Sequence, residues 1–154
     1  MHLWIVYAHI LGALLFMLAH GASVAVLLAL RTERDPVHVR VLMRLSQLTV
    51  GPAYIALLVL IVAGVWAGIE IQAFSSGRLW LWDAVVVLVV ILGGMYSTMS
   101  PAFGQVRQVL GDGSTNVDQA ALDEALSAKG PLVGAIIGLL GILVILWLMV
   151  LKPF

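Results

Sequence analysis

A run of apolar residues from Leu3 to Leu30 contains no Asp, Glu, Lys or Arg, and it limits what this chain can fold into more than any other feature. A helix of about 20 apolar residues crosses the roughly 30 Å of hydrocarbon in a bilayer. Three more runs of this kind follow, and each is bounded by charges or turn residues. We therefore predict four transmembrane helices, at about 3–30, 48–69, 81–99 and 132–151.

The composition supports this assignment. The chain is 62% hydrophobic and 10% charged, with a mean hydropathy of +1.11, whereas a soluble domain is about half apolar and about a quarter charged. A chain of 154 residues cannot hide this excess in a core, because a small fold exposes much of its surface. We predict an all-α fold, a four-transmembrane-helix bundle forming a single integral membrane domain over residues 1–154, with the lipid bilayer as its solvent.

Charge and cysteine content exclude several functions. The formal net charge is zero, so no basic surface points to a nucleic-acid partner. There is no cysteine, which removes disulfides, cysteine-ligated zinc, iron–sulfur clusters and thiol catalysis. No acid–base pair, nucleophile elbow or phosphate-binding loop is visible, so we do not expect an enzyme acting alone. A role as an electron-transfer subunit stays open.

The Lys and Arg residues of the connections predict the orientation of the chain. Two connections on one side carry Arg31, Arg34, Arg40, Arg44, Arg107 and Lys129, and the other side carries only Arg78 and Lys152. This bias places the first and third connections in the cytoplasm, with both termini on the non-cytoplasmic side of the membrane. All five tryptophans then fall at the outer helix ends, where indoles favour the interface: Trp4, Trp66, Trp80, Trp82 and Trp147.

Proline and glycine mark the expected ends and bends of these helices. Asp35-Pro36 is typical of an N-cap followed by proline in the first turn, and the helix that it opens should continue into the second span. Gly51-Pro52 should then kink that helix near the membrane surface. After the third span, Pro101 should loosen the helix.

The third connection carries the signature of a short amphipathic cytoplasmic helix. Asn116 is placed to cap it, with Gln119 three residues later in a capping-box arrangement. The helix should end at Lys129, because Gly130-Pro131 is a strong stop. We expect a connector lying on the bilayer surface, with a docking site for a partner as the alternative.

Three histidines lie on one stripe of the first helix. At 100° per residue, His2, His9 and His20 point within about 40° of one another, and Phe16 shares the stripe. His9 and His20 are about 16.5 Å apart along the axis. Because an unpaired ionisable residue inside a membrane is costly, such residues indicate function, and neutral imidazole is a usual ligand of haem iron, copper and zinc. The alternative is that each histidine hydrogen-bonds another helix.

A second axial ligand is harder to find, because the other spans contain no histidine. At about the depth of His20, the sequence offers Met95, Tyr96 and Met99 on the third helix and Tyr54 on the second. Haem with His/Met ligation is known chemistry, and Met with His also suits Cu(I). The candidate cofactor-binding set is thus His9, His20, Met95, Met99, Tyr54 and Tyr96, with His9, His20 and His2 as metal ligands. Apolar packing is the alternative role of both methionines.

Two further patterns concern helix packing. A two-fold homodimer through the first helix would face each histidine towards its mate, and the mates could clamp haem iron at two depths. Gly64-x-x-x-Gly68 and Gly134-x-x-x-Gly138 have the spacing that lets membrane helices approach closely. We interpret these glycines as packing surfaces within the bundle before dimer contacts.

Several short motifs resemble the copper-resistance-D-like membrane domains, and with them a bacterial family of small four-helix membrane proteins. The resemblance rests on Trp4 with His9-Ile-Leu-Gly-Ala-Leu-Leu-Phe, the arginine-rich 31–44 connection, Gly51-Pro52, Ala63-Gly64-Val65-Trp66, and Trp82 at the start of the third span. It covers most of the chain. It implies copper handling or haem binding, with His9 as the residue carried over. Longer copper-family members have additional helices and further His and Met positions, which are absent from this sequence.

Three functions follow from the sequence. The first is a small b-type haem cytochrome or cytochrome-like subunit, with a respiratory or redox partner and haem b held by the histidines of the first helix. The second is a copper-binding membrane protein, which would be colourless. The third is a cofactor-free scaffold or accessory subunit of a membrane complex, in which replacing His9 and His20 changes nothing.

Overall fold

The computed structural model describes residues 2–74, 79–111 and 117–153, and the regular elements of these ranges are all α-helices. In chain order they are α1 (His2–Thr32), α2 (Pro36–Glu70), α3 (Leu79–Leu110), α4 (Gln119–Ser127) and α5 (Gly130–Leu151). Four segments are long and apolar enough to cross a membrane, namely α1, α2, α3 and Gln119–Leu151, which comprises α4 and α5. The predicted all-α, four-span architecture of a multi-pass membrane protein is confirmed.

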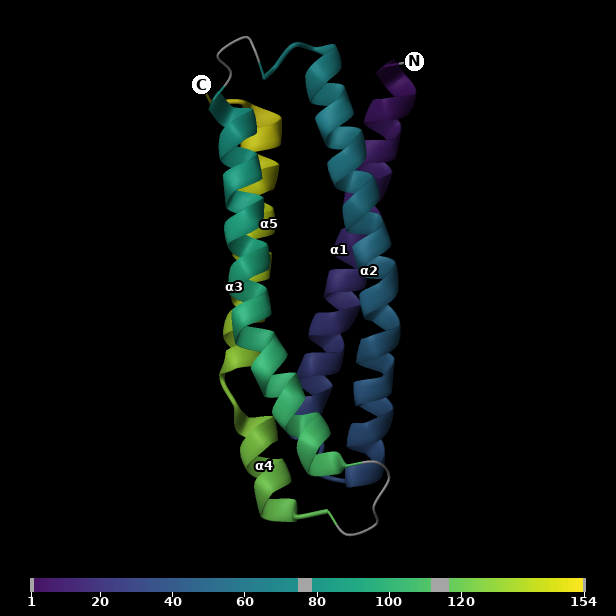
Figure 1. Cartoon of the computed structure of the whole chain (residues 1–154), viewed down its shortest axis with the longest axis vertical. Coiled ribbons are helices and arrows are strands. Elements are labelled where there is room, and N and C mark those ends of the chain that lie inside the picture. The colour runs from purple at the N-terminus through teal and green to yellow at the C-terminus, as the bar shows by residue number, and fades with distance from the viewer. Residues whose placement is uncertain (1, 75–78, 112–116, 154) are drawn as a thin grey trace.

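The helices associate as two pairs (Figure 1). In the first pair α1 packs along α2, and in the second pair α3 packs along α5. Both chain termini lie at one end of the molecule, here called the terminal end, and α4 lies at the other, here called the α4 end (Figure 1). Large apolar side chains on all four long helices face outwards, as lipid-facing surfaces require.

Close backbone approach holds the first pair together. A Cβ atom added to Gly12 of α1 would lie 2.8 Å from the backbone nitrogen of Leu60 and 3.2 Å from the carbonyl oxygen of Ala56, both in α2. The hydroxyls of Ser23 and Thr49, 3.1 Å apart, add a hydrogen bond between the same helices. In lipid, such van der Waals contacts and hydrogen bonds replace the hydrophobic effect as the cause of helix association.

Glycines play the same part in the second pair. A Cβ atom at Gly130 would lie 2.6 Å from the carbonyl oxygen of Thr98 in α3, and one at Gly141 would overlap the side chain of Ile91. Gly134 and Gly138, between them, also face close neighbours. The interpretation of these glycines as packing surfaces within the bundle is therefore supported.

The α4 end contains the larger apolar cluster, to which four helices contribute. Its buried members are Val26, Leu30, Val39, Met43, Val106, Leu110, Leu122, Ala125 and Leu126. Leu122 of α4 and Val39 of α2 are fully enclosed. The expected separate amphipathic helix on the bilayer surface is therefore wrong, because the apolar side of α4 packs against α1, α2 and α3 and only Ala128 and Lys129 separate α4 from α5.

The predicted helix starts are partly confirmed. Asp35 caps α2 as expected, and its side chain accepts a hydrogen bond from the backbone N–H of Val37 at 2.8 Å. The cap of α4 is Asp118, whose carboxylate accepts from the N–H groups of Ala120 and Ala121. The prediction of Asn116 as that cap is wrong, since aspartate caps equally well and stands directly before the helix; Asn116 itself lies outside the described residues.

α3 is longer than the sequence predicts. It continues past Pro101 to Leu110, and its direction changes in its green second half (Figure 1). Proline removes one helical hydrogen bond and bends a helix without necessarily ending it. The extension persists because it buries Ala102, Val106 and Leu110.

The terminal end has a second, smaller cluster of Ala73, Trp80, Leu81, Ala84 and Leu148. Trp80 is buried there, with the Lys152 ammonium 5.6 Å from its ring centroid. The other four tryptophans are exposed at helix ends of this same side, as the predicted aromatic belt requires. Sequence position alone gave no sign that Trp80 differs from them.

Replacing Gly12 with alanine should destabilise the first pair, because the neighbouring atoms are α2 backbone and cannot move cheaply. We expect a loss of about 1–3 kcal/mol in the free energy of unfolding, typical of overpacking, measured by unfolding in detergent micelles. Gly21→Ala in the same helix is the matched control, since nothing lies within 4 Å of its Cβ position, and it should be neutral or slightly stabilising. Equal effects of the two changes would contradict this account of the α1–α2 contact.

A histidine–methionine pair between the helix pairs

The side chain of His20 extends from α1, in the first helix pair, to the second helix pair. Its ring occupies a notch at Gly138 of α5, where an added Cβ atom would lie 2.7 Å from Cε1 and 2.9 Å from Nε2. A side chain at position 138 would therefore collide with the imidazole. The absence of a side chain at Gly138 leaves space for the ring and sets its position along the α5 axis.

Met95 of α3 lies at the same notch. Its thioether sulfur is 3.0 Å from the Cβ position of Gly138, and His20 Nε2 is 2.9 Å from the same point. Since both atoms lie within 3.0 Å of one point, their separation is at most twice that distance. The sequence-based expectation that His20 and Met95 share a depth is met, and three helices bring them together.

The Nε2 atom of His20 has no hydrogen-bond partner. Its exposed surface is below 1 Å², and within the described residues it is the buried side-chain nitrogen or oxygen left without one. A buried polar atom of this kind costs about 1–3 kcal/mol when unpaired. Such an atom calls for an explanation, and an ion or a water molecule bound beside it would supply one.

Phe16 supports the ring from within α1. Its ring is stacked on that of His20, with centroids 6.2 Å apart and an interplanar angle of 17°. Phe16 precedes His20 by one helical turn, so the two side chains are neighbours on the helix surface. The stack restricts the orientation of the imidazole.

Met99 lies about one helical turn after Met95 in α3. Its side chain meets Gly134, which precedes Gly138 by about one turn in α5. The Cβ position of Gly134 is 2.8 Å from Met99 Cγ and 2.6 Å from the Thr98 hydroxyl. That hydroxyl donates to the carbonyl of Gly94 at 2.8 Å. Met99 is thus adjacent to the His20–Met95 pair, with its side chain packed against α5.

His9 has a different environment although it shares the stripe with His20. Its Nδ1 is 2.9 Å from the carbonyl oxygen of Leu60, so Nδ1 carries the hydrogen and donates. Its ring fits against Gly64, whose Cβ position is 2.8 Å from both Cε1 and Nδ1. His9 is therefore tied to α2, which is the hydrogen-bonding alternative for this residue.

His2 and the tyrosines lie away from the His20–Met95 pair. His2 Nδ1 is 2.9 Å from a carboxylate oxygen of Glu70, so this pair joins the start of α1 to the end of α2. Tyr54 and Tyr96 are 65% and 71% exposed, so both face away from the protein interior. No group of three or more His, Cys, Asp or Glu suited to a metal ion occurs in the described part of the chain.

The α1–α2 turn holds a separate charged group. His38 Nδ1 lies 3.4 Å from a Glu33 oxygen and 3.6 Å from an Asp35 oxygen. The backbone N–H of Asp35, and then that of Arg34, donate to Glu33 and hold the pKa of its carboxyl below the usual value. The group is exposed and ties the turn between α1 and α2 together. It lies outside the part of α1 that carries His20.

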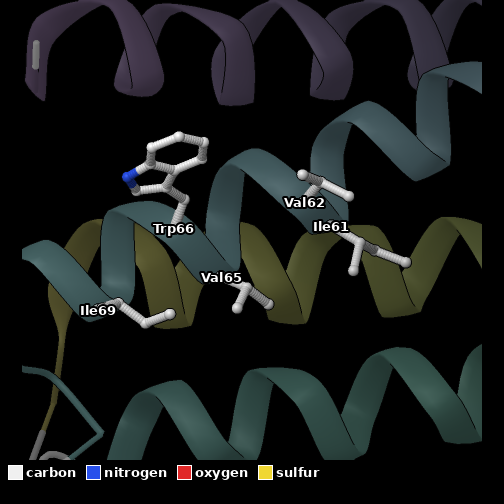
Figure 2. Close-up of a pocket in the computed structure, with 5 residues that line it drawn as sticks. All are labelled: Ile61, Val62, Val65, Trp66 and Ile69. Carbon is white, nitrogen blue, oxygen red and sulfur yellow. The ribbon is translucent and has the colours of Figure 1, made fainter.

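Two apolar hollows lie on the first pair. Figure 2 shows one of them, formed along α2 by Ile61, Val62, Val65, Trp66 and Ile69. The other lies between α1 and α2 and is lined by Trp4, Ile5, Ala8, Leu58, Val59, Val62, Ala63 and Trp66. Neither hollow includes His20 or Met95, and their apolar linings match contact with lipid chains.

The structure therefore brings together His20 and Met95, with Met99 adjacent, and places His2, His9, Tyr54 and Tyr96 elsewhere. The imidazoles of His9 and His20 are directed at other helices of the same chain, which is not the arrangement expected of a dimer in which each histidine faces its mate. Sequence reasoning did not assign Gly64 and Gly138 as notches for rings. Glycine spacing was the available signal, but it does not say which side chain enters.

Comparison with protein-family models, curated proteins and solved structures found no match to this chain. The resemblance to copper-resistance-D-like membrane domains stays a prediction. What is known of the site is the geometry described above.

The two stripe histidines should respond differently to replacement by leucine. His9→Leu removes a hydrogen bond to the Leu60 carbonyl and should reduce the free energy of unfolding by about 1 kcal/mol. His20→Leu removes an unpaired buried polar atom and should be neutral or stabilising in metal-free protein. Unfolding of both variants in the same detergent checks this, and a larger loss for His20→Leu would show that His20 has a structural partner.

Proposed function

We propose that this multi-pass membrane protein binds a Cu(I) ion between His20 and Met95. The observation that carries the proposal is the buried, unpartnered Nε2 of His20 beside the Met95 sulfur at the Gly138 notch. An ion placed there gives the orphaned nitrogen a partner. This is the copper-binding alternative of the sequence analysis, located at one position.

The donor chemistry suits this ion. Thioether sulfur and neutral imidazole are ligands that Cu(I) accepts, whereas Mg²⁺ and Ca²⁺ prefer carboxylate and carbonyl oxygens. The spans 3–30 and 132–151 contain no Asp or Glu. A single positive charge is less costly to bury in such surroundings than a double one, because the desolvation penalty rises with charge.

Haem fits the same residues less well. Its two axial ligands must stand on opposite faces of a porphyrin, but the Gly138 notch lacks room for one added carbon beside the His20 ring. Haem ligation by His20 and Met95 would require α1 to withdraw from α5. Cu(I) needs only the space between the two donor atoms, which is far less than a porphyrin requires.

Copper titration of the purified protein tests the proposal. In detergent and under reducing conditions, the chain should take up a single Cu(I) in competition with a colorimetric Cu(I) chelator. His20→Leu and Met95→Leu should each weaken binding at least about tenfold, equivalent to about 1.4 kcal/mol. His9→Leu and Met43→Leu are the matched controls and should bind like the unchanged chain, because neither side chain lies at the notch.

Other outcomes of this experiment identify the rival functions. Soret and α bands in the absorption spectrum of the purified protein would replace copper with haem. A purified protein with neither bound metal nor absorption bands, whose activity and spectrum do not change when His9 or His20 is replaced, would indicate a scaffold or accessory subunit. Loss of copper binding in His9→Leu with retention in His20→Leu would place the site at His9.

We also propose that the terminal end faces the non-cytoplasmic side of a bacterial inner membrane. Six of the eight Lys and Arg residues lie in the two stretches of chain that turn at the α4 end, residues 31–44 and 107–129, which is the bias expected of the cytoplasmic side. Four exposed tryptophans at the terminal end support an interface there.

Single cysteines test this orientation cleanly, because the chain contains none. In intact cells, Ser76→Cys should react with a membrane-impermeant maleimide, and Ser114→Cys should react only after permeabilisation. The opposite labelling pattern would reverse the orientation, and labelling of both in intact cells would contradict a fixed one.

A further inference from the structure

Each helix pair is closely packed within itself. Gly12 lets α1 approach the α2 backbone at Leu60, and Gly130 and Gly141 let α5 approach α3 at Thr98 and Ile91. Fewer residues connect one pair with the other, and the two pairs stand apart along much of their length in Figure 1. The pairs are therefore the units between which relative movement is easiest.

Contacts between the pairs occur at three levels. The apolar cluster with Leu122 joins them at the α4 end, where Arg31 also donates to the Ala128 carbonyl at 3.3 Å. At the terminal end, the Cβ position of Gly68 in α2 lies 3.0 Å from a methyl carbon of Leu81 in α3. Between these levels, the His20 side chain extends from α1 to the Gly138 notch of α5, where the Met95 sulfur of α3 also lies.

The proposed ligand atom is closed to solvent in this arrangement. His20 Nε2 has less than 1 Å² of exposed surface, and the adjacent notch is filled by the ring itself and by the Met95 sulfur. For an ion to reach this nitrogen, the atoms that enclose it must move apart, and they belong to α1 of the first pair and to α3 and α5 of the second. Entry to the site and separation of the helix pairs are thus linked by geometry.

We propose that the ion held by His20 and Met95 cross-links the two helix pairs, so that its binding closes them at mid-span and its release requires them to separate. The inference rests on the proposed function, because it needs the same ion at the same atoms. His20 belongs to the first pair and Met95 to the second, so any ion bound to both bridges α1 and α3.

The physical basis is linkage. A ligand shifts an equilibrium between two arrangements by its difference in affinity for them, and an ion with two donors from different pairs finds both only when the pairs are together. Separated pairs offer it one donor. Occupancy must therefore favour the closed arrangement, and by reciprocity closure must favour occupancy.

The distance between two spin labels measures this coupling. Ag(I) replaces Cu(I) as the probe, since it has similar ligand preferences and needs no reductant that would destroy nitroxides. Ile61→Cys in α2 and Leu143→Cys in α5 are exposed positions, one in each pair, and carry maleimide-linked labels in the full chain. Val86→Cys with Leu143→Cys, both within the second pair, is the matched control.

Ag(I) should narrow the distance distribution between labels 61 and 143 and shift it to shorter values. It should leave the 86–143 distribution unchanged. Adding Met95→Leu to the first labelled pair should abolish the shift, because the ion then loses the donor that the second pair places beside His20. The metal content of each sample is measured in parallel and shows whether Ag(I) is bound.

The outcomes separate the two proposals. Bound Ag(I) that depends on His20 and Met95, with an unchanged 61–143 distribution, would overturn the cross-link and leave the proposed function standing. An equal shift in the Met95→Leu chain would also overturn the cross-link. Failure of both Ag(I) and Cu(I) to bind would overturn the proposed function and this inference with it.

Discussion

Helices immersed in lipid gain little from burying apolar side chains against each other, because the surrounding hydrocarbon is equally apolar. Close van der Waals contact has to hold them, and in this chain glycine permits it by leaving out Cβ. Gly12 brings α1 onto the α2 backbone, and Gly130 and Gly141 bring α5 onto α3. These contacts define two helix pairs, and every other feature of the molecule is arranged on them or between them.

The same device builds the candidate site. Gly64 and Gly138 each receive an imidazole, so two histidines of α1 are held in similar steric surroundings. Their polar surroundings differ, because His9 donates to the Leu60 carbonyl while His20 Nε2 has no partner. From the helix stripe alone, the two residues are equally good candidate ligands. Hydrogen bonding distinguishes them, because His9 has a partner in the protein and His20 Nε2 has none. The Met95 sulfur beside the second one is the reason that we propose a soft metal ion at this position.

Differences between expectation and structure fall where tertiary packing opposes a local signal. Pro101 predicts a loosened helix, yet α3 continues to Leu110 because that extension buries apolar side chains. The connection after α3 predicts a helix lying on the bilayer, yet Leu122 is fully enclosed within the bundle. In both cases the local pattern predicts only what its own segment favours, and contacts with residues far away in the sequence decide the outcome.

The sequence by itself determined the number of spans, the Asp35 cap and the shared face of His9 and His20. Each of these depends on length, hydropathy or helical periodicity, which are properties of one segment. Only the tertiary structure decided that His9 faces α2 while His20 faces α5 and Met95, and that Tyr54 and Tyr96 point outwards. A helical stripe fixes the direction of a side chain relative to its own axis. The partner that it meets depends on which helices pair and at what height, and contacts between distant segments set both.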